Sequence, residues 1–188
     1  MSKFSTIFVV VGTPGSGKDL LVQAVNDMGS LHCRIVPKHT DRPRQSDDSN
    51  EMICIDDIDY DLDGCDIVYD NYENKYGIKL PLIFDQLAMG VSQVVVVSNI
   101  NAINQLKKCF SNQIKLVFVH SEMDEEQYRA EQRKLSKPKK YIEERVGKYR
   151  QALDIYYRNI ASFDHVLIYS DSQEDLFDQI FRLFNYYE

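Results

Sequence analysis

A glycine-rich loop directly after an apolar segment constrains the fold of this chain more than any other feature. Residues 7–11 are apolar, and the sequence Gly-Thr-Pro-Gly-Ser-Gly-Lys-Asp follows at positions 12–19. It fits the pattern GxxxxGK, in which backbone N–H groups surround phosphate oxygens, the lysine adds a positive charge and the next helix presents its N-terminus. Apolar residues then recur at helical spacing, at Leu20, Leu21, Ala24 and Val25. The motif predicts a strand, a phosphate-binding loop and a helix, with a nucleoside triphosphate as ligand.

The loop supplies the predicted binding residues for this triphosphate, which are Gly12, Thr13, Pro14, Gly15, Ser16, Gly17, Lys18 and Asp19. Its last position departs from the usual pattern, because Asp19 stands where a Ser or Thr hydroxyl would contact a magnesium ion. The Asp19 carboxylate could bind Mg²⁺ or its water shell. A first-turn carboxylate also favours the positive end of the helix dipole, so both roles stay open.

The composition limits the kinds of partner. The 188 residues, 44% of them hydrophobic, are enough for one well-buried core. A net charge of -7 argues against general binding to nucleic acids or anionic membranes, because an acidic surface repels phosphate groups. No apolar run approaches the roughly 20 residues that span a bilayer, and the first residues lack a signal-peptide pattern. The four cysteines match no zinc pattern. We expect a cytoplasmic monomer or homodimer with reduced cysteines.

Apolar runs alternate with helical patterns along the chain. The expected strands are residues 7–11, 33–36, 94–97, 116–119 and 166–169, and the expected helices are 18–28, 81–89, 103–110, 124–134, 139–160 and 174–187. Val94 to Val97 form an unbroken β-branched run, which is typical of a central parallel strand covered on both faces. The alternation predicts an α/β fold with a doubly wound parallel sheet.

The segment at about 38–80 interrupts this alternation. Acidic residues are dense between Asp47 and Glu73, and Met52 to Ile55 resemble a short strand. The acids lack the ordered spacing and the terminal Glu of an EF-hand calcium loop, so a solvated acidic face is the favoured interpretation. We expect a single domain over 1–188, with a core at about 1–37 and 81–188 and a small lobe inserted between them.

Further basic and phenolic groups are candidates for binding phosphate. Lys38 to Arg44 form a basic segment that Pro43 keeps out of a helix, and arginines can hold a phosphate at two points. Tyr76 could donate to the same anion. The alternative is that these residues bind no ligand, with the arginines solvated at the surface and the tyrosine packed against its neighbours.

A third basic group follows late in the chain. Arg129 and Arg133 are four residues apart on one helix face, and Arg145 lies beyond the break at residues 137–140. They predict a helical hairpin at about 124–150 that folds over a triphosphate and excludes water, or else an exposed helix with ordinary ion pairs.

The order of these pieces resembles the guanylate kinase family of nucleoside monophosphate kinases over nearly the whole chain. The matching segments are the loop at Gly12 to Lys18, Thr40 to Arg44, Tyr76-Gly77, the three late arginines and Phe163 to Ile168. The resemblance implies a P-loop kinase fold with an acceptor-binding lobe and a helical lid. It further implies ATP and Mg²⁺ as cofactors, catalytic roles for Lys18, Arg129, Arg133 and Arg145, and binding of the acceptor phosphate by Arg42, Arg44 and Tyr76.

The resemblance leaves the acceptor open. A phosphorylated small molecule is expected, with a nucleoside monophosphate such as GMP as the first hypothesis, although the guanine-reading residues of that family are not in register near Met52, Ile67 and Asn99. The chain is also similar to the ribose 1,5-bisphosphate phosphokinases, which share Gly-Lys-Asp in the loop and a strand ending in an Asn/Ser turn. Two further alternatives remain. One is a non-catalytic module that binds a protein partner, and the other is a nucleotide sensor that binds its ligand without transferring phosphate.

Overall fold

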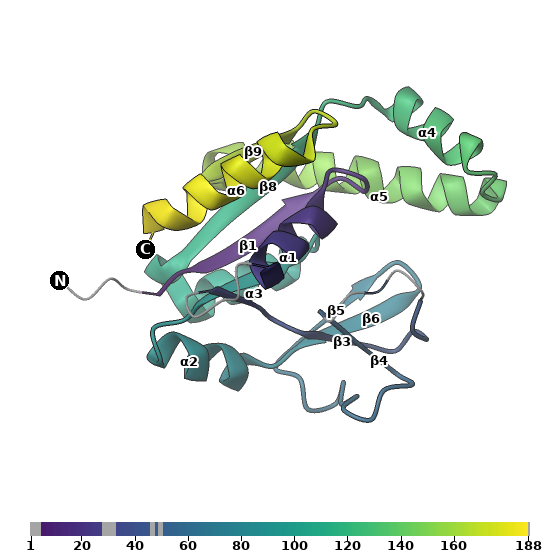
Figure 1. Ribbon diagram of the computed structural model, residues 1–188. Coiled ribbons are helices and arrows are strands. Elements are labelled where there is room, and N and C mark those ends of the chain that lie inside the picture. Colours follow the sequence, from purple (N-terminus) through teal and green to yellow (C-terminus); the bar gives the residue numbers. More distant parts are fainter. Residues whose placement is uncertain (1–4, 28–32, 46–47, 49–50, 188) are drawn as a thin grey trace.

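A parallel five-stranded sheet in the order β2-β7-β1-β8-β9 forms the centre of the protein (Figure 1). The computed structural model describes residues 5–27, 33–45, 48 and 51–187. The strands are β1 (Ile7–Gly12), β2 (Cys33–Ile35), β7 (Ser92–Val96), β8 (Ile114–Ser121) and β9 (His165–Tyr169). Each overlaps a strand expected from the sequence, and the unbroken apolar runs of β1 and β7 suit strands that are covered on both faces. The α/β fold class is confirmed.

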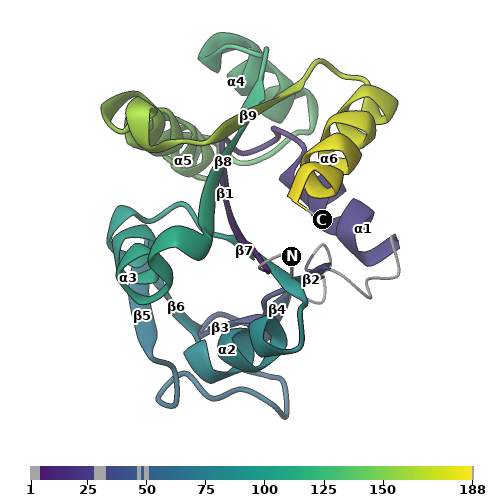
Figure 2. The same ribbon diagram turned by 90° about the vertical axis from the view of Figure 1, so that its left-hand side faces the viewer.

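Helices cover both faces of this sheet (Figure 2). The covering helices are α1 (Lys18–Asp27), α2 (Leu80–Ala88), α3 (Ile100–Phe110), α5 (Lys139–Arg158) and α6 (Gln173–Tyr187). The helix α4 (Glu125–Lys134) packs on α5, and two 3-10 turns are η1 (Ser111–Gln113) and η2 (Ile160–Ser162). Leu21 of α1 and Leu176 of α6 are buried in the core on one face. Ile103 of α3 and Ile155 of α5 are buried in the core on the other.

The helix boundaries agree with the sequence expectations to within a few residues. Ser172 Oγ accepts a hydrogen bond from the backbone of Asp175 at 3.2 Å, as predicted for the start of the last helix. The predicted helix end at Met28 with its stop at Gly29 lies outside the described residues, as does Asp47. No helix in the described ranges is both long and apolar enough to cross a membrane.

A second, four-stranded sheet in the order β4-β3-β6-β5 lies between β2 and α2 in the sequence. Its strands are β3 (Lys38–Thr40), β4 (Met52–Cys54), β5 (Ile67–Asn71) and β6 (Asn74–Ile78), and we call residues 38–78 the lobe. Acidic and basic side chains in and beside it form ion pairs, which are Arg42 with Asp48, Arg44 with Asp57, and Lys79 with Asp61. Most of the other described acids of the segment, such as Asp56, Asp59 and Asp63, are exposed, which agrees with a solvated acidic face.

The direction in which the chain crosses the sheet reverses between the neighbouring strands β1 and β7. From β1 the chain runs through α1 to β2 at one edge, whereas from β7 it runs through α3 to β8 on the other side of β1. The helix after β1, α1, packs on one face of the sheet, and the helix after β7, α3, packs on the other. In open α/β sheets, ligands bind at the carboxyl ends of the strands at such a reversal. The glycine-rich loop begins at this point, directly after β1.

Candidate functional site

A cleft of about 480 Å³ lies at this reversal. Its walls come from the glycine-rich loop, the lobe, the end of β7 and α5. Five cationic side chains and three carboxylates line it among the described residues, which are Lys18, Lys38, Arg42, Arg145 and Lys148 against Asp19, Asp48 and Glu51. The excess of cations stands out in a chain of net charge -7. It favours an anionic ligand in the cleft.

The shape of the loop requires glycine. Gly15 and Gly17 have φ values of 80° and 83°, in the left-handed region that disfavours other residues. A Cβ atom at Gly17 would also lie 2.7 Å from Leu176 Cδ2 of α6. Within the loop, the hydroxyl oxygens of Thr13 and Ser16 are buried and have no hydrogen-bond partner among the described residues. Such a loop can bring its backbone N–H groups close to an anion.

Lys18 lies across the loop at the start of α1. Its Nζ atom donates to the carbonyl oxygen of Thr13 at 2.5 Å. Burial lowers the pKa of Lys18 to about 8, while Asp19 raises it and Arg145 lowers it. Asp19 itself is exposed and lines the cleft. An anion beside the ammonium group would favour its protonated form and so oppose the effect of burial.

The lobe brings two of its three predicted residues into the cleft. Arg42 lines the cleft and holds Asp48 through both of its terminal nitrogens, with Nη1 2.7 Å from Oδ2. Burial raises the pKa of Asp48, but hydrogen bonds from Arg42 and a backbone N–H lower it overall. Tyr76 also lines the cleft, stacked on Tyr69 with 5.7 Å between ring centroids.

Arg44, the third predicted residue of the lobe, has a different environment. Its guanidinium donates to Asp57, with Nε 3.1 Å from Oδ1, and to the carbonyl oxygen of Met52 at 2.8 Å. It is exposed and is not among the described residues that line the cleft. The two arginines, although only two positions apart, are held by two different aspartates.

The α4–α5 hairpin presents one of its three predicted arginines to the cleft. Arg145 on α5 lines the cleft, and its Nε atom is buried with no hydrogen-bond partner in the described part of the chain. Arg129 on α4 instead pairs with Glu143 and with Glu125. Arg133 is exposed, and neither α4 arginine is among the described lining residues. The geometry brings Arg145, and not the α4 pair, to the side of Lys18.

Several lining residues carried no motif in the sequence. Lys148 on α5 faces the cleft, where its Nζ atom lies 2.6 Å from Glu144 and 4.7 Å from the centre of the Tyr72 ring. Glu51 lines the lobe side. Both belong to segments rich in charged residues, so the sequence could not distinguish them from solvated neighbours.

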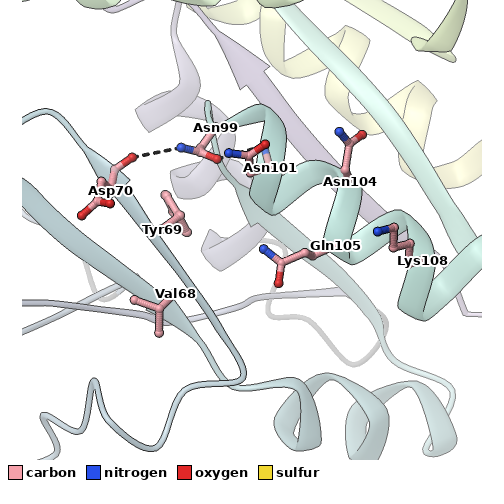
Figure 3. Close-up of a pocket in the computed structure, with 8 residues that line it drawn as sticks. All are labelled: Val68, Tyr69, Asp70, Asn99, Asn101, Asn104, Gln105 and Lys108. Atoms are coloured by element: carbon pink, nitrogen blue, oxygen red, sulfur yellow. Dashed lines mark hydrogen bonds between the residues drawn. The ribbon is translucent and has the colours of Figure 1, made fainter.

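A second cavity of about 560 Å³ lies between β5 and α3 (Figure 3). Amide side chains make up half of its described lining, which comprises Val68, Tyr69, Asp70, Asn99, Asn101, Asn104, Gln105 and Lys108. Asn99 Nδ2 donates to the carbonyl oxygen of Asp70 at 2.9 Å and so links the core to the lobe. Its Oδ1 atom also caps the start of α3. No residue predicted from the sequence to bind a ligand lines this cavity.

Comparison with known proteins identifies the fold. No protein-family model and no curated protein matches the chain. Among solved structures, a guanylate kinase from Anaplasma phagocytophilum is similar, with a TM-score of 0.66, 14% sequence identity, and coverage of 98% of this chain and 86% of that chain. A dephospho-CoA kinase from Campylobacter jejuni has a TM-score of 0.45 and 12% identity, with 98% of each chain covered. The first similarity shows that the chain has a guanylate kinase-like P-loop kinase fold.

Proposed function

We propose that this chain is an ATP-dependent phosphotransferase, which moves the γ-phosphoryl group of ATP to a small molecule that already carries a phosphate. We call this molecule the second substrate. One observation carries the proposal: a single cleft joins the loop and Lys18 to a second group of cations, Lys38 and Arg42, on the lobe. Transfer between two phosphorylated molecules needs two neighbouring anion sites, because catalysis depends mainly on positioning and charge stabilisation.

The loop is suited to the triphosphate of ATP. Its glycines give the backbone the curvature that an anion cradle needs, and the buried hydroxyls of Thr13 and Ser16 lie in the same loop. Lys18 and the N-terminus of α1 add positive charge. These groups would hold the phosphates while the rest of the cleft stays free for the second substrate.

A bound Mg²⁺ ion would neutralise charge on the terminal phosphates. Within the described ranges, no group of three or more His, Cys, Asp or Glu residues could hold a metal ion. The chain therefore fits an ion bound chiefly by phosphate oxygens and water, as is usual for Mg²⁺. Asp19 would be the protein's contribution, either directly or through a water molecule.

In the proposed reaction, an oxygen of the second substrate forms a bond to the γ-phosphorus while the bond from that phosphorus to ADP breaks. No protein nucleophile is required. Arg42 and Tyr76 would position the phosphate of the second substrate. Lys18 and Arg145 would stabilise the charge on the transferring group, and α4 and α5 would exclude water that could take it.

GMP is the first candidate for the second substrate, because the fold is similar to that of a guanylate kinase. A phosphorylated ribose is the alternative, supported by Asp19 in the loop and by the Ser98-Asn99 turn after β7. A non-catalytic binding module is the less favoured hypothesis, since the glycines and the lysine of the loop are all retained.

The proposal is tested by incubating the protein with ATP, Mg²⁺ and one of several nucleoside monophosphates or sugar phosphates. ADP release and ³¹P NMR of the products are followed. We expect one class of compound to be phosphorylated, with Lys18→Ala as the inactive control. If ATP–Mg²⁺ binds but no compound stimulates ADP release, the chain would be a non-catalytic binding protein and not a phosphotransferase.

A further inference from the structure

Lys38 and Glu51 meet on the lobe side of the cleft. Lys38 begins β3, and Glu51 directly precedes β4, which pairs with β3 in parallel. The backbone N–H of Lys38 donates to the carbonyl oxygen of Glu51 at 2.7 Å. Strand pairing therefore fixes the two residues beside each other, and the side chains of both line the cleft.

The Lys38 ammonium group is buried but only partly used. Its side chain is 8% exposed, and Nζ donates to the carbonyl oxygen of Val96, at the end of β7, at 2.7 Å. The nearest oxygen of Glu51 is 3.9 Å from Nζ, too far for a hydrogen bond. An ammonium group has three N–H donors, so Lys38 can donate to a ligand while it keeps its contact with the core.

Glu51 lacks a hydrogen-bond donor for one of its oxygens. Its side chain is 13% exposed, and Oε2 is buried with no hydrogen-bond partner among the residues that the structure describes. A buried carboxylate oxygen without a donor is unfavourable, and a donor group on a ligand would remove that cost. The pair also acts across the cleft on Lys18, whose pKa is lowered chiefly by burial, raised by Glu51 and lowered by Lys38.

We propose that Lys38 and Glu51 select the second substrate by its hydrogen-bonding groups. Lys38 donates to one atom of that molecule, and Glu51 accepts from the same atom or an adjacent one. The ligand is then a phosphorylated molecule with a donor beside an acceptor, a chemistry that sugar hydroxyls and a purine edge with a carbonyl next to an N–H both provide. This inference rests on the proposed function, in which Arg42 and Tyr76 hold the phosphate of the second substrate.

The test is isothermal titration of the wild-type chain and of Glu51→Gln, which keeps the size of the side chain and replaces one accepting oxygen with a donor. The probes are ribose 5-phosphate, 2-deoxyribose 5-phosphate, GMP, AMP and inorganic phosphate. We expect ribose 5-phosphate or GMP to bind the variant at least about tenfold more weakly, because a buried acceptor has become a donor. Binding of inorganic phosphate should change less than about twofold.

The analogues identify the source of the hydrogen bonds. If the 2-hydroxyl meets Glu51, the variant should lose affinity for ribose 5-phosphate more than for its 2-deoxy analogue. If a base edge does, the loss should be seen for GMP or AMP and not for ribose 5-phosphate, which has no base. Lys38→Met should weaken the same compound, and the double variant should lose less than the sum of the two single changes.

Glu73→Gln is the matched control, because Glu73 is an exposed glutamate in the β5–β6 turn of the same lobe, and it should behave as wild type. Circular dichroism checks that each variant is folded. Equal affinities of wild type and Glu51→Gln for every probe would overturn the inference, as would failure of both GMP and ribose 5-phosphate to bind a chain that still binds ATP–Mg²⁺. Failure of ATP–Mg²⁺ to bind would overturn the proposed function, and the inference with it.

Discussion

Burial and ligand binding have opposite effects on the ammonium group of Lys18. Without an anion, the pKa of Lys18 is lowered to about 8, chiefly by burial and in smaller part by the nearby Arg145. Phosphate oxygens would favour the charged form. Between about pH 8 and the ordinary value of 10.5, the unfolded chain binds more protons here than the folded chain, so this residue makes the stability of the ligand-free protein rise with pH.

The same shift predicts a pH dependence of ATP binding. Affinity should fall as the pH rises above about 8, by up to about tenfold per unit, because ATP must then bind together with a proton. Titration calorimetry at pH 7, 8 and 9, in two buffers of different ionisation enthalpy, measures both the affinity and the proton uptake. Lys18→Met should bind weakly with little dependence on pH over this range. A wild-type affinity that is constant from pH 7 to 9 would contradict this role for Lys18.

The two lobe arginines should differ in their effect on the second substrate. Arg42→Ala should raise its KM by about 10- to 100-fold, because a charge-assisted hydrogen bond contributes about 1.5–3 kcal/mol. Arg44→Ala removes the pair with Asp57 outside the lining of the cleft and should leave KM within about threefold. Steady-state kinetics on whichever compound is phosphorylated would measure both values. Similar KM values for Arg42→Ala and wild type would remove Arg42 from the site.

The α4–α5 hairpin is held together independently of any ligand. Asp124 and Gln127 form a capping box at the start of α4, and Tyr128 packs with Val146 and Tyr149 in a small core of its own. Glu125 accepts hydrogen bonds from Arg129 and from Arg150 of α5. Ion pairs within the hairpin therefore occupy Arg129, whereas Arg145 faces the cleft.

This arrangement predicts unequal effects of the hairpin arginines on catalysis. Arg145→Ala should lower kcat by at least about 100-fold, because an arginine that meets developing charge makes a contribution of this order or larger. Arg129→Ala should lower kcat less than about fivefold and mainly reduce the thermal stability of the hairpin. Single-turnover rates at saturating substrates would measure the chemical step. The reverse order, with Arg129 the more important residue, would show that α4 moves into the cleft during the reaction.

At the scale of the whole molecule, the core was predictable from the sequence and the lobe was less so. The strands β1, β7, β8 and β9 of the parallel sheet contain apolar runs that can be recognised without knowing their neighbours. Lys38, His39 and Thr40 of β3 instead are polar residues that become buried only through tertiary contacts, such as the hydrogen bond from the backbone of Asp61 to His39 Nδ1. Their burial gives no periodic signal.

The candidate site follows the same division. The loop could be identified because close approach of the backbone to phosphate demands glycines at fixed spacing. Arg42 pairs with Asp48, whereas Arg44 pairs with Asp57. The sequence shows many charged residues in this segment but does not show which of them pair. The presence of Glu51 and Lys148 in the lining of the cleft likewise depends on the position of their elements around it.

Titration of ATP–Mg²⁺ into the wild-type chain and into Lys18→Ala tests most directly whether the glycine-rich loop at residues 12–19 binds a triphosphate. We expect one molecule of ATP to bind per wild-type chain, and an affinity at least about tenfold lower in the variant with its unfolding temperature little changed. Equal binding by the two proteins, or no binding by the wild type, would contradict the proposed binding of ATP by the loop.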